Sequence, residues 1–340
     1  MRLLRHRYLR RLVTIPAVYA ALVLLVTTLP LWLLAASAVS YWLPGKWRPF
    51  RLLWFLIVYL ALEVVGIVAA GALWIGAGFG RTTSREDVQA VHYRVLAALL
   101  GILMRTASRA FKLRIDLQAP PLPGAAPDVD RGPRPLLVFS RHAGPGDSFL
   151  LVHELMHVYG RRPRVVLKNT LQWDPLIDLM LNRLPSRFIT PNPKAGVQVA
   201  QSIGTLASDL TADDALVIFP EGGNFSESRR QRGIARLEEA GHGEYVERAH
   251  ALTYLMAPRP SGAFAAIDAA PDADVVFVAH TGLEQLVTLR DLWRGLPMDA
   301  DVRAQFWTVR AEDVPSDKDV RMAWLFDWWE VMDTWIEQRR

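Results

Sequence analysis

The sequence predicts an α/β fold, in which a largely parallel sheet flanked by helices follows an N-terminal helical hairpin. Short apolar runs that are typical of buried strands alternate with helical segments through the second half of the 340-residue chain. Two long apolar runs precede them, and 51% of all residues are apolar, which is high for a soluble protein. We therefore expect a membrane-anchoring hairpin domain over residues 1–85 and an α/β domain over residues 86–340.

The two apolar runs are the basis for the hairpin. Residues 13–43 contain no charged side chain, and in residues 52–80 the only one is Glu63. Because about 20 apolar residues cross a bilayer as a helix, each run is long enough. Arginines precede the first run and follow the second, which predicts a cell-membrane protein with the α/β domain facing the cytoplasm. Two alternatives stay open, a cleaved signal peptide and a hairpin that dips into one leaflet.

Composition also limits the partners. The chain contains no cysteine, which excludes disulfides, thiolate catalysis and Cys-ligated zinc. The net charge of +5 suits an anionic membrane surface as well as a nucleic acid. Because the arginines gather beside the apolar runs and no nucleic-acid-binding motif is present, we expect membrane lipids as partners and no nucleic acid. The sequence gives no indication of the oligomeric state.

The segments that follow the hairpin lead into the sheet. Residues 91–111 have helical periodicity, and this helix either lies in the headgroup region or faces the core. Residues 112–117 alternate polar and apolar side chains, which predicts a half-buried strand. Residues 120–135 are rich in proline, glycine and aspartate and are expected to form a loop.

From residue 136 onward the predicted elements alternate. The expected strands are residues 136–140, 165–167, 188–190, 215–219 and 274–278. The expected helices between them are residues 149–159, 175–181 and 197–209. In such a sheet, catalytic and ligand-binding residues lie mostly where strands end and loops begin. A last helix, at residues 320–340, carries tryptophans on one stripe, which either pack into the core or contact a membrane interface.

Two catalytic motifs overlap behind the strand at residues 136–140. His142 stands five residues before Asp147, the arrangement of a general base whose imidazole is oriented by a carboxylate. The same stretch continues into His153-Glu154-Leu155-Met156-His157, the H-E-x-x-H pattern of a zinc protease. Composition alone produces this pattern with a chance of roughly one in a hundred, so the zinc hypothesis is a real alternative.

The residues further along the chain favour the first motif. A zinc site needs three protein ligands, and the position six residues after the second His, where metzincins carry a third, holds Pro163. The His–Asp pair is instead followed by a second buried strand that ends in Phe219-Pro220-Glu221-Gly222. We therefore expect His142 and Asp147 to be catalytic and expect no bound metal.

Taken in order, these motifs resemble the glycerolipid acyltransferase family that includes 1-acylglycerol-3-phosphate acyltransferases. The resemblance covers residues 136–278, and its blocks are His142 to Asp147, Arg187-Phe188-Ile189 and Phe219-Pro220-Glu221-Gly222. A further block, Met256-Ala257-Pro258-Arg259-Pro260-Ser261-Gly262, is similar to the lysophospholipid and lysocardiolipin branch. The resemblance implies transfer of an acyl chain from acyl-CoA or acyl carrier protein to a hydroxyl of a lysophospholipid or related glycerolipid, without a cofactor.

The resemblance also implies roles for single residues. His142 is the general base, and Asp147 fixes its tautomer and supports the imidazolium that forms. The loop at residues 143–146 is expected to direct backbone N–H groups at the developing oxyanion. The residues expected to line the acceptor site are Glu221, Gly222 and Gly223.

Two arginines of the family pattern are replaced. Pro191 and Asn224 stand where the family has arginines that are expected to bind the phosphate of the acceptor. The cations expected to substitute for them are Arg187, Arg259 and Lys168, with Arg229 and Arg230 as further candidates. Besides acyl transfer, two functions stay open, a membrane zinc protease and a non-catalytic, lipid-binding member of the fold.

Overall fold

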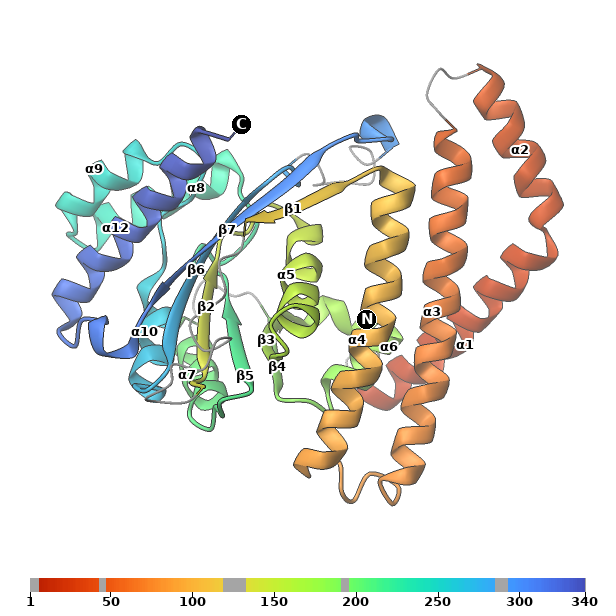
Figure 1. The fold of residues 1–340 in the computed structure, drawn as a ribbon, viewed down its shortest axis with the longest axis horizontal. Helices are drawn as coiled ribbons and strands as arrows, with labels where there is room; N and C mark the ends of the chain where they lie inside the picture. Colours follow the sequence, from red (N-terminus) through yellow and green to blue (C-terminus); the bar gives the residue numbers. More distant parts are fainter. Residues whose placement is uncertain (1–5, 43–46, 119–132, 191–195, 285–292, 340) are drawn as a thin grey trace. The chain divides into compact units, whose positions relative to one another are not determined.

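The computed structural model describes residues 6–42, 47–118, 133–190, 196–284 and 293–339 (Figure 1). The chain divides into two compact units. The helical unit comprises Met1–Arg114, Leu167–Thr190 and Arg290–Ala300, and the sheet unit comprises Ile115–Val166, Pro191–Leu289 and Asp301–Arg340. The predicted division after residue 85 stays a prediction, because compactness alone does not show which segments fold independently.

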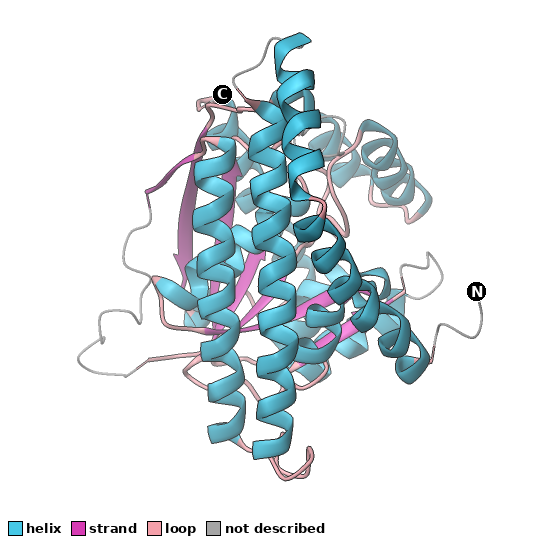
Figure 2. Ribbon diagram, turned by 90° about the vertical axis from the view of Figure 1, so that its right-hand side faces the viewer, coloured by secondary structure: helices cyan, strands magenta, loops and turns pink. Residues whose placement is uncertain are grey.

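The helical unit opens with α1 (Arg7–Thr27), α2 (Leu29–Trp42), α3 (Arg48–Gly76) and α4 (Glu86–Phe111). Of these, α1, α3 and α4 are each long and apolar enough to cross a membrane. Helix α4 packs along α3, and Figure 2 shows the long helices side by side. The first apolar run forms two helices rather than one arm of a hairpin. The chain breaks at Thr28, two residues before Pro30, because proline has no N–H to continue the hydrogen bonds of α1 and is tolerated only in the first turn of a new helix.

The short helix η2 (Asn169–Trp173) is followed by α6 (Pro175–Leu181). Polar contacts connect α6 to the apolar helices of the same unit. Arg10 and Arg11 of α1 both bind the carboxylate of Asp178, at 2.7 and 2.8 Å. Glu63, the one charged residue of the second apolar run, accepts the backbone N–H of Leu176 at 3.3 Å. These charges are tolerated among apolar helices because each has a polar partner.

The sheet contains seven strands in the order β1-β7-β6-β2-β5-β3-β4. They are β1 (Arg114–Gln118), β2 (Leu136–Ser140), β3 (Arg162–Lys168), β4 (Ser186–Ile189), β5 (Asp214–Ile218), β6 (Asp274–Thr281) and β7 (Asp301–Val309). Strand β2 pairs in parallel with β5 and β6, and β3 pairs in parallel with β5, whereas β7 is antiparallel to β6. The predicted α/β fold with a largely parallel sheet is confirmed.

Helices cover both faces of the central strands. On one face, α7 (Gly196–Ala207), α10 (Pro260–Ala269) and α12 (Lys318–Glu337) pack against Leu137 and Phe139 of β2. On the other face, α5 (Pro145–His157) packs against Leu136 and Val138. Successive side chains of a strand point to opposite faces, so β2 is buried completely and reads as a continuous apolar run. Each fully buried Leu or Phe contributes about 1.5–3 kcal/mol.

The C-terminal helix α12 belongs to the core of the sheet unit. Trp329 is fully buried and donates its indole N–H to the carbonyl of Met256 at 3.1 Å. Trp328 stacks on Phe277 of β6, with the ring centroids 4.9 Å apart. Of the two hypotheses for this helix, core packing is therefore confirmed. Helices α8 (Glu227–Glu239) and α9 (Gly243–Ala251) were not predicted, because few of their residues are apolar.

Candidate active site

His142 and Asp147 are brought together by the turn between β2 and α5. Asp147 lies in the first turn of α5, where an acidic side chain can reach back to the amides before the helix. Its Oδ2 accepts the N–H groups of Ala143 at 2.7 Å and Gly144 at 3.0 Å. The expectation that these two amides face an oxyanion is wrong, because the carboxylate already takes both of them.

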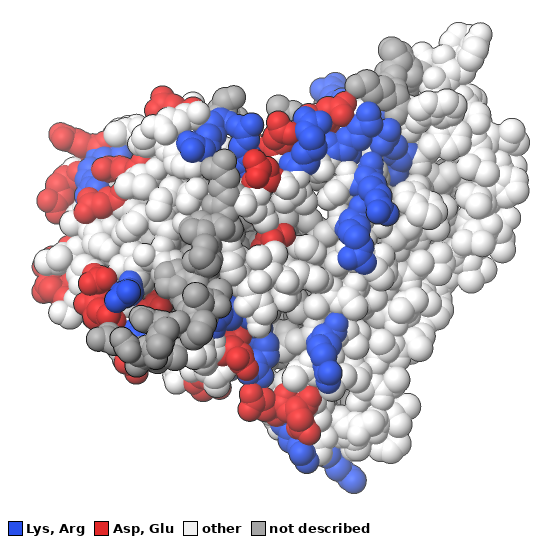
Figure 3. Space-filling model, viewed as in Figure 1, with Lys and Arg blue, Asp and Glu red and all other residues white. Residues whose placement is uncertain are grey.

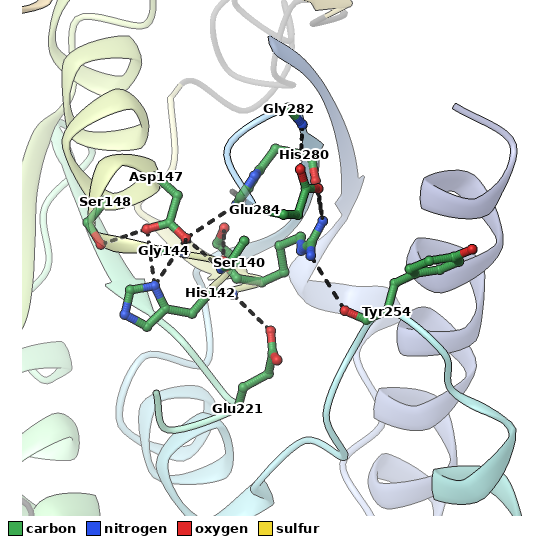
Figure 4. A network of polar contacts seen from close by, with 12 residues as sticks. Ser140, His142, Gly144, Asp147, Ser148, Glu221, Tyr254, His280, Gly282 and Glu284 are labelled. Atoms are coloured by element: carbon green, nitrogen blue, oxygen red, sulfur yellow. Dashed lines mark hydrogen bonds and ion pairs between the residues drawn. The ribbon is translucent and has the colours of Figure 1, made fainter. Parts of the chain in front are cut away.

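The imidazole of His142 faces this carboxylate (Figure 4). Nδ1 lies 3.1 Å from each oxygen of Asp147, and the hydroxyl of Ser148 donates to Oδ1 at 3.1 Å. Burial alone raises the pKa of Asp147, but the neighbouring imidazoles of His142 and His280 outweigh this effect, so the pKa lies well below its ordinary value. A charged Asp147 places the proton on Nδ1 and leaves the lone pair of Nε2 for a substrate.

Glu221 holds the backbone of His142 from the neighbouring strand. It follows β5, and its Oε1 accepts the N–H of His142 at 2.8 Å while Oε2 accepts the N–H of Met256 at 3.1 Å. Burial raises the pKa of Glu221 to about 7, although the His142 amide and the Arg141 guanidinium lower it. The ring of Phe219 stacks on the imidazole of His142, with the centroids 4.4 Å apart. The Phe-Pro-Glu block therefore fixes both the backbone and the ring of His142.

Two glycines after Glu221 bring arginine side chains close to the loop. Gly222 has a φ of +72°, and a Cβ there would lie 2.8 Å from Cζ of Arg259. A Cβ on Gly223 would lie 3.4 Å from a guanidinium nitrogen of Arg229, which also donates to the carbonyl of Asn224 at 2.7 Å. Among the residues that the structure describes, the guanidinium of Arg259 has no hydrogen-bond or ion-pair partner. The loop therefore lies between two guanidinium groups, and one of them is free to bind an anion.

A buried polar network lies behind Asp147 (Figure 4). The guanidinium of Arg141 donates to the carbonyl of His280 at 2.5 Å and to Glu284 at 3.0 Å. Glu284 also accepts the backbone N–H of Gly282 at 2.8 Å. The Nε2 atom of His280 lies 3.6 Å from Oδ2 of Asp147. The end of β6 is thereby joined to the turn that carries the His–Asp pair.

Comparison with known proteins decides the family. Residues 127–281 match the family model described as Acyltransferase. This segment is an acyltransferase domain. It belongs to the glycerolipid acyltransferase family that the motifs predicted, and it contains His142, Asp147 and Glu221. No curated protein and no solved structure matches the chain significantly.

Two cations predicted for the acyltransferase domain lie in the helical unit. Lys168 ends β3, and Arg187 is an exposed residue of β4. His142 and Arg259 belong to the sheet unit. Pro191 lies outside the described residues. The substrate-binding roles of Lys168 and Arg187 stay predictions, whereas Arg259 lies beside Gly222 in the same unit as the His–Asp pair.

The H-E-x-x-H motif forms the C-terminal end of α5 in the acyltransferase domain, where Glu154 and Leu155 are buried and His157 is exposed. The rings of His153 and His157 stack 4.2 Å apart, and Nδ1 of His153 contacts Glu154 at 2.9 Å. Nδ1 of His157 faces the carbonyl of His153, one turn earlier, at 3.1 Å. No group of three or more His, Asp or Glu side chains that could hold a metal ion occurs within the described part of the chain. The zinc-protease hypothesis therefore finds no support.

Three residues of the polar network beside the His–Asp pair were not predicted, namely Arg141, His280 and Glu284. A signal for His280 is present in the sequence, because it lies at the carboxyl end of an apolar strand, as His142 does. The predicted strand ended at residue 278, so His280 was not assigned to it. Arg141 precedes the catalytic candidate and reads as a surface charge, because its partners are more than 100 residues away in sequence.

Proposed function

We propose that this protein is a membrane-bound acyltransferase that moves an acyl chain from acyl-CoA or acyl carrier protein to a hydroxyl of a lysophospholipid or related glycerolipid. The observation that carries the proposal is the His142–Asp147 pair, in which a buried, charged carboxylate orients an imidazole within an acyltransferase domain. The proposed reaction uses an acyl thioester as a substrate and requires no resident cofactor. The lysophospholipid branch is favoured by the block around Arg259.

The proposed reaction begins with proton transfer to His142. Nε2 takes the proton of the acceptor hydroxyl as its oxygen attacks the thioester carbonyl carbon, and a C–O bond forms. When the tetrahedral intermediate collapses, the C–S bond breaks and Nε2–H returns the proton to the leaving sulfur. The products are an ester and a free thiol, and His142 is neutral again. Asp147 stabilises the imidazolium that exists between the two proton transfers.

Arg259 and Arg229 are the proposed binding groups for an anionic headgroup. They flank the Gly222–Gly223 turn directly after Glu221, which itself holds His142. Partial burial, followed by the positive charges of Arg236 and Arg229, lowers the pKa of Arg259, as expected where cations gather without anions. A guanidinium fork matches phosphate oxygens. The pair thus compensates for Asn224, which replaces a family arginine in the same loop.

Replacing Arg259 with alanine is expected to raise the KM for an anionic lysophospholipid roughly 10- to 100-fold, because a charge-assisted hydrogen bond contributes about 1.5–3 kcal/mol. The kcat and the KM for the thioester are expected to stay within about twofold, since the site binds only the headgroup. Steady-state kinetics in mixed micelles measure these constants. The control is Arg230→Ala, whose guanidinium already binds the carbonyl of His250 at 2.7 Å. An equal rise of KM for donor and acceptor contradicts the assignment.

We propose that the helical unit holds the enzyme at the cell membrane, with the acyltransferase domain on the cytoplasmic side. Three helices are long and apolar enough to cross a bilayer, and the surface over α2 and α3 in Figure 3 is nearly free of charged side chains. Arginines precede the first apolar run and also follow the second, which favours a cytoplasmic location both for the N-terminus and for the segment that leads into the acyltransferase domain. Membrane lipids supply both the anchoring environment and the acceptor.

The proposal is tested with the purified full-length protein in nanodiscs. Radiolabelled acyl-CoA or acyl carrier protein is supplied with one lysolipid at a time, namely lysophosphatidate, lysophosphatidylglycerol, lysophosphatidylethanolamine or monoacylglycerol. Mass spectrometry identifies the product, and formation of a diacyl lipid from one acceptor supports the proposal. Tight lipid binding without transfer from either donor would instead favour a non-catalytic role. Peptide hydrolysis with stoichiometric zinc would favour the protease.

A further inference from the structure

His280 is a buried histidine that the proposed reaction does not use. It is the penultimate residue of β6, the strand that pairs in parallel with β2, and only 4% of it is exposed. Neither of its ring nitrogens has a hydrogen-bond partner within the described residues. Leaving a buried polar group unpaired costs about 1–3 kcal/mol. The position of this imidazole therefore calls for a functional explanation.

The ring of His280 lies close to the proposed catalytic carboxylate. Nε2 of His280 lies 3.6 Å from Oδ2 of Asp147, whereas Nδ1 of His142 lies 3.1 Å from both oxygens. At 3.6 Å the contact is electrostatic and longer than a normal hydrogen bond. The carboxylate thus has two imidazoles as neighbours, from two adjacent strands.

The structure around His280 keeps this contact in place. Arg141 donates to the carbonyl of His280 and to Glu284, and Glu284 accepts the N–H of Gly282. Gly282 has a φ of +95°, and a Cβ there would lie 2.3 Å from the carbonyl oxygen of Asp301. Only glycine fits this turn, so the end of β6 has little freedom to move the ring away from Asp147.

We infer that His280 is a positioning residue that acts through Asp147 and sets how strongly this carboxylate holds the Nδ1–H of His142. A neutral imidazole with its proton on Nε2 directs a positive N–H dipole at Oδ2. This dipole orients the carboxylate and offsets part of its charge, which lowers the basicity of His142. The inference rests on the proposed function, because it assigns His142 as the base.

Other charged groups face the same region and have to be considered. Arg141 donates to the carbonyl of His280 and to Glu284. Burial alone raises the pKa of Glu284, but the Arg141 guanidinium and backbone N–H groups lower it below its ordinary value. Glu221 accepts the backbone N–H of His142, and the negative charge of Asp147 contributes to its raised pKa. The carboxylate of Asp147, 3.6 Å from Nε2 of His280, favours a proton on that nitrogen. None of these groups changes in the variants below.

The test compares the pH dependence of kcat/KM for acyl transfer in wild-type protein, His280→Leu and His280→Gln. Without the dipole, Asp147 stabilises the imidazolium of His142 more strongly. The acidic limb of the profile, where kcat/KM rises as His142 loses its proton, is therefore expected to move to higher pH in His280→Leu by roughly half a unit to one unit. The plateau kcat falls because the carboxylate is less well oriented, and KM changes little. His280→Gln keeps an N–H donor and is expected to retain most of the wild-type profile.

The matched control is His242→Leu, which makes the same replacement at an exposed position of the sheet unit. Circular dichroism confirms folding, and if His280→Leu does not fold, His280→Ala takes its place. An acidic limb that coincides with the wild type, or an equal shift in the Leu and Gln variants, overturns the inference. If His142→Ala transfers acyl chains normally, the proposed function fails and the inference fails with it. If only His142→Ala is inactive and the limb does not move, the inference alone is overturned.

Discussion

Replacing His142 with alanine is expected to lower kcat for acyl transfer by roughly 100- to 10,000-fold, the contribution of a positioned general base. The variant loses the only side chain whose ring nitrogen is held by Asp147 at hydrogen-bond distance within the described residues. Because the imidazole packs on Phe219 but remains partly exposed, its loss is expected to leave the fold intact. Initial rates with acyl-CoA and the identified acceptor measure the effect, and circular dichroism checks folding.

His153→Ala is the matched control for this variant. His153 lies on α5, near the same turn, and its ring stacks on His157 rather than facing Asp147. We expect its acyl-transfer rate to stay within about twofold of the wild type, because its side chain contacts Glu154 and His157 and not the His–Asp pair. The reverse pattern, in which His153→Ala is inactive and His142→Ala is active, would contradict the general-base assignment and revive the H-E-x-x-H motif.

Replacing Asp147 with asparagine is expected to be nearly as damaging, with kcat reduced by roughly 100- to 10,000-fold. The carboxylate accepts N–H groups from Ala143, Gly144 and His142 and the hydroxyl of Ser148. An asparagine presents an NH₂ group to some of these donors and cannot stabilise an imidazolium by charge. An unsatisfied buried donor costs about 1–3 kcal/mol, so the free energy of unfolding is expected to fall by a similar amount.

Rates and urea unfolding on the same preparation separate the two effects of Asp147→Asn. The control is Ser148→Ala, which removes one hydrogen bond to Oδ1 and leaves the charge of the carboxylate in place. We expect Ser148→Ala to retain at least about a tenth of the activity, because a single neutral hydrogen bond contributes about 0.5–1.5 kcal/mol. If Asp147→Asn folds and keeps wild-type activity, the carboxylate has no part in catalysis.

Local patterns in the sequence were enough to predict most of the central sheet and the catalytic candidates. The strand predicted at residues 136–140 coincides with β2, because a strand buried on both faces needs a continuous apolar run. The segment predicted as a helix at residues 149–159 begins earlier, at Pro145, since the turn after His142 leads directly into α5. His142, Asp147 and Glu221 were assigned because they follow two recognisable strands within motifs that resemble the glycerolipid acyltransferase family.

The sequence by itself determined the order of apolar strands, the apolar N-terminal helices and the spacing of the His–Asp pair. Tertiary structure alone decided that Glu221 holds the backbone of His142 and that His280 faces Asp147. Glu221 is 79 residues from His142, and parallel pairing of β2 with β5 and β6 brings the ends of all three strands to one edge of the sheet. Short-range periodicity carries no information about such contacts, because strand order is set by how the whole core packs.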